Sequence, residues 1–132
     1  PNHADSYYNM GNALKAQGKL DKAIEAYKKA ISLNPNHVLA HNNMGRALKE
    51  QGKLDKAIHS FKKVLIIEPN NIDAYYNMGV TFKFQGKLDQ AIEAYKKALC
   101  IRRDYVEAYY NMSIALTGVV FTKPNRGIQK TR

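Results

Sequence analysis

The sequence is poor in several features, and each absence excludes a class of protein. Cys100 is the only cysteine among 132 residues, so the chain has no internal disulfide framework and fits a reducing compartment. No apolar run approaches the roughly 18 residues that a membrane-spanning helix needs, and the run at 64–67 has the length of a core segment. Residues 1–5 carry neither the basic start nor the apolar stretch of a signal peptide. We therefore expect a cytoplasmic protein.

Catalytic and metal-binding patterns are also missing. The glycines are single and regularly spaced, unlike those of a phosphate-binding loop. His37 and His41 have the spacing of a helical metal pair, but His37 falls in an expected turn and no glutamate follows as in the zinc-protease motif. We expect structural roles for both histidines and a buried, inert thiol at Cys100. No metal, no cofactor and no enzymatic activity are expected.

The charge balance is strongly positive. Lys and Arg number 21 against 11 Asp and Glu, which gives a formal net charge of +10 and favours acidic partners. The charge is spread along the chain, with lysine pairs at 28–29, 62–63 and 96–97. These pairs have the charge to follow nucleic-acid phosphates, but no nucleic-acid motif accompanies them. Because surface lysines commonly serve solubility, nucleic acid is the least favoured partner.

The dominant signal is an internal repeat with a step of 34 residues. Repeats of this length are typical of arrays in which each unit is one supersecondary element. Two short motifs carry the step, one in each half of the unit. They are Asn-Met-Gly at 9–11, 43–45 and 77–79, continued as Asn-Met-Ser at 111–113, and Gly-Lys-Leu-Asp at 18–21, 52–55 and 86–89.

Each unit predicts two helices joined by a tight turn. In the first unit, residues 4–16 place an apolar stripe at three- and four-residue steps, which is typical of a helix. Gly18 can adopt the positive φ that the turn requires. Asp21 is expected to cap the second helix, because it stands just before an apolar-periodic run. Pro35 ends that helix, since proline cannot continue the helical hydrogen bonds.

This pattern resembles the tetratricopeptide repeat (TPR) family. The departures from the family pattern are His41, Val64 and Arg103. The resemblance implies an all-α fold, a right-handed α-solenoid of antiparallel helix pairs, in which Gly11 and Ala23 allow close approach of two helices. The matching positions of the first unit are Tyr7, Met10, Gly11, Leu14, Ala23, Tyr27, Ala30 and Pro35.

The family frame also divides the chain. Residues 1–117 form the array, and the helix at 106–117 serves as its terminal cap. Residues 118–132 are basic and contain Pro and Gly, so we expect a flexible tail. Residues 1–3 repeat 35–37, which indicates a fragment of a longer array. The units are 4–37, 38–71, 72–105 and the half unit 106–117.

The resemblance places the first helices along a concave groove, which implies a scaffold that binds an extended peptide or partner segment. The sixth position of every unit is Asn, a poor helix former whose carboxamide both donates and accepts hydrogen bonds. This row is similar to the asparagine ladder of the O-GlcNAc transferase TPR superhelix. The alternative is that these residues only bridge adjacent helices. The candidate peptide-binding residues are Asn9, Asn43, Asn77, Asn111, Tyr8, Asn12, Asn42, Arg46, Tyr76, Tyr110, Lys15, Lys49 and Lys83.

The resemblance also implies a second binding mode, and the sequence leaves one alternative function. Chaperone-binding members hold an acidic C-terminal tail in a carboxylate clamp, but three positions that require cations hold Tyr8, Asp73 and Asn77 here. Since Asp73 would repel a carboxylate, we reject that mode. The alternative function is self-assembly, in which exposed apolar end faces pair to form a homo-oligomer.

Overall fold

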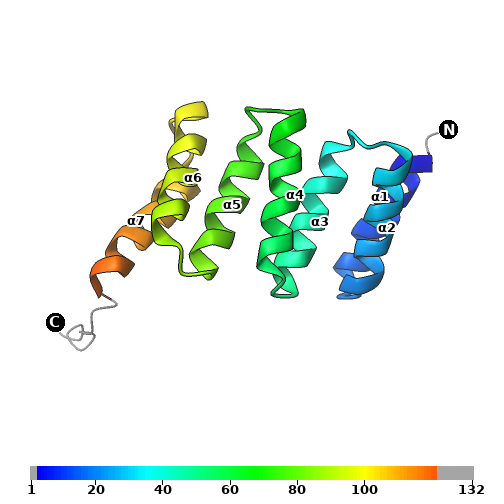
Figure 1. Ribbon diagram of the computed structural model, residues 1–132, viewed down its shortest axis with the longest axis horizontal. Coiled ribbons are helices and arrows are strands. Elements are labelled where there is room, and N and C mark those ends of the chain that lie inside the picture. Colours follow the sequence, from blue (N-terminus) through cyan, green and yellow to red (C-terminus); the bar gives the residue numbers. More distant parts are fainter. Residues whose placement is uncertain (1–2, 122–132) are drawn as a thin grey trace.

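The computed structural model describes the backbone of residues 3–121 and the side chains of residues 3–117. In that range the chain forms seven helices and no strand, so the predicted all-α fold is confirmed. Figure 1 shows the helix pairs following one another along the long axis of the molecule, in chain order from α1 and α2 to α7. The helices are α1 (His3–Ala16), α2 (Leu20–Leu33), α3 (Val38–Glu50), α4 (Leu54–Ile67), α5 (Ile72–Phe84), α6 (Leu88–Ile101) and α7 (Val106–Phe121).

The turn inside each helix pair depends on one glycine. Gly18, Gly52 and Gly86 have φ angles of 79°, 80° and 77°, in the left-handed region that residues with a Cβ rarely adopt. The predicted positive φ at Gly18 is therefore confirmed, and the same turn closes all three pairs.

The predicted cap at Asp21 is wrong. Helix α2 already begins at Leu20, and no side chain caps its first turn. The Asp21 carboxylate instead accepts a hydrogen bond from Gln51 Nε2 in the next pair, and Asp55 accepts one from Gln85 Nε2 at 2.7 Å. These bonds tie α2 and α4 to the turn of the following unit.

Side chains cap α3 and α5, the first helices of the second and third pairs. His37 Nδ1 accepts the backbone N–H of Ala40 at 3.2 Å, and Asn71 Oδ1 accepts that of Ala74 at 2.9 Å. Each cap pairs a backbone donor that the first helical turn leaves unsatisfied. His37 Nε2 lies 2.9 Å from Asp5 Oδ1, so the same ring links α3 to α1.

Two departures from the family pattern are absorbed by the core. His41 is buried in place of the aromatic residue, and its Nε2 donates to the carbonyl of Pro35 at 2.9 Å. Val64 is fully buried, while Arg103 lies exposed in a turn. The 34-residue succession of helix pairs therefore continues across these three positions.

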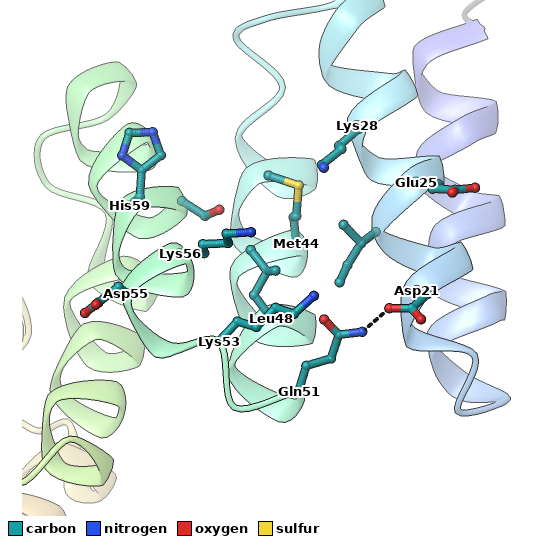
Figure 2. A pocket seen from close by; sticks show the side chains of 12 residues that line it. Asp21, Glu25, Lys28, Met44, Leu48, Gln51, Lys53, Asp55, Lys56 and His59 are labelled. Carbon is teal, nitrogen blue, oxygen red and sulfur yellow. Dashed lines mark hydrogen bonds between the residues drawn. The ribbon is translucent and has the colours of Figure 1, made fainter.

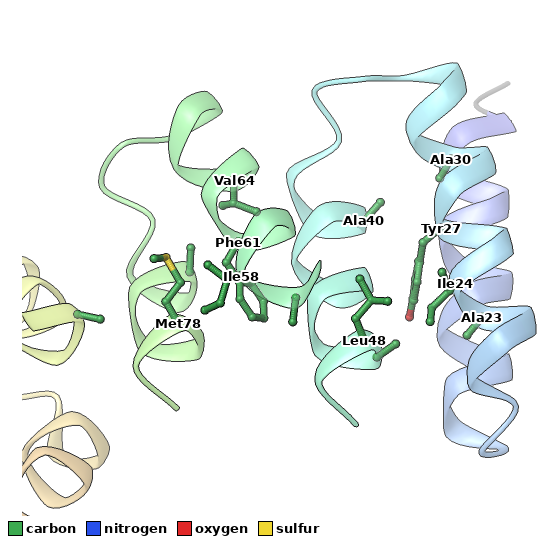
Figure 3. Close-up of a cluster of buried hydrophobic side chains, with 14 residues drawn as sticks. Ala23, Ile24, Tyr27, Ala30, Ala40, Leu48, Ile58, Phe61, Val64 and Met78 are labelled. Atoms are coloured by element: carbon green, nitrogen blue, oxygen red, sulfur yellow. The ribbon is translucent and has the colours of Figure 1, made fainter. Parts of the chain in front are cut away.

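Within each pair, a glycine of the first helix packs on an aromatic ring of the second. A Cβ built on Gly11 would lie 2.6 Å from the Tyr27 ring, and one on Gly45 would lie 2.5 Å from Phe61. Because Tyr27 and Phe61 are fully buried, these contacts lie in the centre of the core (Figure 3). The third pair repeats the arrangement with Gly79 and Tyr95.

The array curves toward its first helices. Helix α1 contacts α3, α3 contacts α5, and α5 contacts α7. Among residues 3–121 no comparable contact joins α2 to α4 or α4 to α6, and open grooves separate these second helices instead. Helices that stand closer together line the inside of a curve, so α1, α3, α5 and α7 form the concave face.

The end of the array differs from its sequence-based description. Helix α7 continues to Phe121, so residues 118–121 are helical and not part of a tail, while residues 122–132 lie outside the described range. Cys100 is exposed and not buried. Its repeat-related positions, Ser32 and Ile66, are exposed too, so this phase of the second helix faces solvent. No helix within 3–121 is long and apolar enough to cross a membrane.

We expect Gly45→Ala to lower the free energy of unfolding by about 1–3 kcal/mol, because the new methyl group overlaps the Phe61 ring. Chemical denaturation followed by circular dichroism measures the change. In a Phe61→Leu background the smaller side chain makes room, so the same substitution should cost less than in the wild type. Equal costs in both backgrounds would contradict the close contact.

Candidate functional site

A groove of about 450 Å³ lies on the concave face. Helices α1, α3 and α5 supply its walls, and the turn before α7 adds Tyr105. Aromatic rings and amide groups dominate its surface, with one cation and one anion among them. Its lining residues are Tyr8, Leu39, Asn42, Asn43, Arg46, Asp73, Tyr76, Asn77 and Tyr105.

The repeated asparagines tie neighbouring units together. Asn43 Nδ2 donates to Tyr8 Oη at 3.2 Å and to Asn12 Oδ1 at 2.9 Å, both in the preceding unit. Asn111 Nδ2 donates to Tyr76 Oη at 2.9 Å in the same way. The bridging role that the sequence left as an alternative is therefore present in the fold.

Asn77 makes a weaker link of the same kind. Its Nδ2 lies 3.5 Å from Oδ1 of buried Asn42, at the outer limit of a hydrogen bond. Both amide hydrogens of Asn43 are used within the protein, so its carbonyl oxygen is the group that this side chain can offer to a ligand. The first asparagine of the row, Asn9, is exposed on α1.

The buried tyrosine of the second helix has a hydrogen-bond partner beneath the groove in the first pair but not in the third. Tyr27 Oη donates to Asn12 Oδ1 at 2.7 Å, and burial, followed by the neighbouring Tyr8, raises the pKa of Tyr27 to about 12. Val80 stands where the first unit has Asn12. Tyr95 Oη is consequently buried without a hydrogen-bond partner in the described structure, and burial raises the pKa of Tyr95 as well.

A lysine lies in the last turn of each of the helices α1, α3 and α5. Lys15 Nζ lies 3.3 Å from Glu50 Oε2, and Lys83 Nζ donates to Asn111 Oδ1 at 3.2 Å. Lys49 Nζ stands 5.9 Å from the centre of the Phe84 ring. The predicted lysines therefore lie at one edge of the concave face, each with a different neighbour.

Six of the predicted residues meet in the 450 Å³ groove, namely Tyr8, Asn42, Asn43, Arg46, Tyr76 and Asn77. Sequence reasoning did not propose Leu39 or Tyr105 as binding residues. The sequence does contain a sign that Leu39 is unusual. The same repeat position holds an acidic residue in the other units, namely Asp5, Asp73 and Glu107. The remaining candidates lie outside the groove, and they are Asn9, Asn12, Lys15, Lys49, Lys83, Tyr110 and Asn111.

A second groove, of about 640 Å³, opens on the opposite side of the array between α2 and α4. Met44 and Leu48 of α3 form its floor, and Figure 2 shows Lys28, Lys53 and Lys56 around it. Acidic side chains line the same groove, so its charges are mixed. The lysine pairs at 28–29, 62–63 and 96–97 are exposed on these second helices, as expected for the convex side.

Comparisons with known proteins agree with this geometry. A family model described as TPR repeat matches residues 11–52 and 45–86, and one described as tetratricopeptide repeat matches residues 72–105. No curated protein sequence gives a significant match.

Solved structures share the fold across most of the chain. A crystal structure of MamA has a TM-score of 0.84 and 28% identity, covering 91% of this chain and 70% of that one. The first TPR of Spaghetti (RPAP3), bound to the HSP90 peptide SRMEEVD, has a TM-score of 0.84, 22% identity, and coverages of 89% and 93%. The second TPR domain of human RPAP3, in complex with the HSP70 peptide SGPTIEEVD, has a TM-score of 0.81, 23% identity, and coverages of 86% and 94%.

The two buried tyrosines should respond oppositely to loss of the hydroxyl group. Tyr27→Phe removes a donor to Asn12 and should lower the free energy of unfolding by about 1 kcal/mol. Tyr95→Phe removes a hydroxyl that lacks a partner and should leave the stability unchanged or raise it. Urea denaturation of the two variants, each the other's control, measures both effects. Equal destabilisation by both changes would show that Tyr95 has a partner in solution.

Proposed function

We propose, from the premise that this chain belongs to the tetratricopeptide repeat family, that its concave face binds an extended peptide segment of a partner protein. As a TPR array, the chain is a protein–protein interaction module. The observation that carries the finer proposal is the groove of about 450 Å³ along α1, α3 and α5. A groove that crosses several units suits an extended chain, which can contact each unit in turn.

The lining of the groove supports this ligand class. Tyr8 and Tyr76 offer flat contact area with hydrogen-bonding tips, at low cost in side-chain entropy. The carbonyl oxygen of Asn43 can accept a backbone N–H of the ligand, because its amide hydrogens are used inside the protein. Contacts to backbone groups give affinity without requiring one particular sequence.

The ligand that we propose is an internal segment and not an acidic chain terminus. The two RPAP3 structures hold HSP90 and HSP70 peptides that end in EEVD. In this chain Asp73 lines the groove and would repel such a terminus. We further propose that the module has no catalytic role of its own and acts in a reducing compartment such as the cytoplasm.

A second candidate function, self-assembly, rests on the apolar surface of α7. Tyr110 is 66% exposed and Leu116 is 49% exposed, and Val106, Tyr109 and Ile114 are exposed on the same helix. Apolar patches of this kind pair readily with a second copy.

Self-assembly through α7 predicts that the mass measured by light scattering rises with concentration and that Leu116→Glu keeps the protein monomeric. A constant mass over the whole concentration range would contradict self-assembly.

Substitution of Leu39 tests groove binding without disturbing the fold. Leu39→Asp should weaken capture of short peptides from a random library at least tenfold, because it places a charge on an apolar part of the groove. The repeat already holds an acid at this position in its other units, so the melting temperature should change little. Fluorescence polarisation with peptides selected by the wild type provides the measurement.

The matched control is Ile66→Asp, which places the same charge at another exposed apolar residue, away from the groove. It should leave peptide affinity unchanged. Equal loss of affinity in both variants, or none in either, would show that the concave face is not the binding surface.

A further inference from the structure

We infer that the basic edge of the concave face holds a subsite for a carboxylate of the ligand, formed by Arg46 and Lys49 with Phe84 beside them. The inference rests on the proposed function and adds a ligand class to it. The class is a peptide segment in which an acidic side chain stands next to an apolar one.

The first observation is a local excess of positive charge. Arg46 and Lys49 are three residues apart on α3, so their side chains share one face of that helix. Lys15 reaches the same region from the preceding unit, and its ammonium group pairs with Glu50. Among residues 3–117 no acidic side chain forms an ion pair with Arg46 or Lys49.

The second observation is the electrostatic state of Lys49. Burial, followed by the positive charge of Arg46, lowers the pKa of Lys49, and Lys15 adds to the effect. Glu50 opposes it without cancelling it. A ligand carboxylate placed between Arg46 and Lys49 would supply the missing counter-charge and form charge-assisted hydrogen bonds with both.

The third observation is an exposed aromatic ring at the same place. Phe84 is 63% exposed at the end of α5, and Lys49 Nζ stands 5.9 Å from the centre of its ring. An apolar side chain of the ligand can cover this ring while its acidic neighbour meets the two cations. The pairing of one carboxylate with one apolar group follows from this arrangement.

The charges at the two edges of the groove also restrict where an acidic residue of the ligand can bind. Arg46 and Asp73 line the same groove, Arg46 in the C-terminal half of α3 and Asp73 in the first turn of α5. An acidic residue of the ligand is attracted at one edge and repelled at the other. A peptide in the groove therefore places its acidic side chain at the Arg46 edge.

The test uses the full chain and a random library of short peptides with blocked ends. Peptides selected by the wild type should be enriched in Asp or Glu next to an apolar residue. For one selected peptide, the acidic form should bind about tenfold more tightly than the analogue with Asn or Gln in its place. In the variant Arg46→Gln/Lys49→Gln that ratio should fall to near one, while the neutral analogue keeps its affinity.

The matched control is Lys63→Gln/Lys97→Gln, which removes the same net charge from exposed positions on the second helices. Its preference for the acidic peptide should stay tenfold. A ratio near one in the wild type, with peptides still bound, overturns this inference and leaves the proposed function standing. Failure of the wild type to select any peptide overturns both.

Further arms identify the source of the carboxylate. One peptide carries its only carboxylate at a free C-terminus, and another carries phosphoserine in place of the acidic residue. The side-chain carboxylate should bind best. A preference for either alternative that survives in Arg46→Gln/Lys49→Gln overturns the subsite, whereas a preference lost in that variant supports it.

Discussion

The contact between a glycine and an aromatic ring inside each helix pair is the constraint on which the rest of the array depends. At Gly11, Gly45 and Gly79 no Cβ fits, so the second helix lies directly on the backbone of the first. This contact fixes the separation of the two helices in every unit. The repeated contact lets the three pairs stack in a regular way, and regular stacking places the first helices side by side along the concave face.

Polar bonds between units then determine what the concave face offers. Asn43 donates both amide hydrogens to the preceding unit, and Asn111 donates to Tyr76 of the preceding unit and to the Glu107 carbonyl of its own helix. The row of asparagines is therefore part of the scaffold as well as of the groove. Lys83 is held by Asn111 in the same way. Among the side chains of residues 3–117, no acidic group forms an ion pair with Arg46 or Lys49, so these two cations can meet the carboxylate of a partner. The structure thus separates groups that build the groove from groups that can serve a ligand.

The sequence predicts the helices, the turns and the close approach at Gly11 because these features are decided within one unit. It does not predict the partners of Asp21 and Asn43, which lie about one repeat away in the chain and depend on how units stack. The position of Cys100 is an intermediate case. Its exposure follows from the polar residue Ser32 at the same repeat phase, but not from the pattern of a single helix.

Ser113 on α7 occupies the position that is glycine in the three preceding first helices. In each of the three preceding pairs, a Cβ added at this position would overlap the aromatic ring of the second helix. A helix with an aromatic residue at the phase of Tyr95 would therefore have to stand further from α7 than α6 stands from α5. Ser113 thus gives this face of α7 a different shape from that of α1, α3 and α5, and the close glycine–ring contact of the three pairs cannot form there.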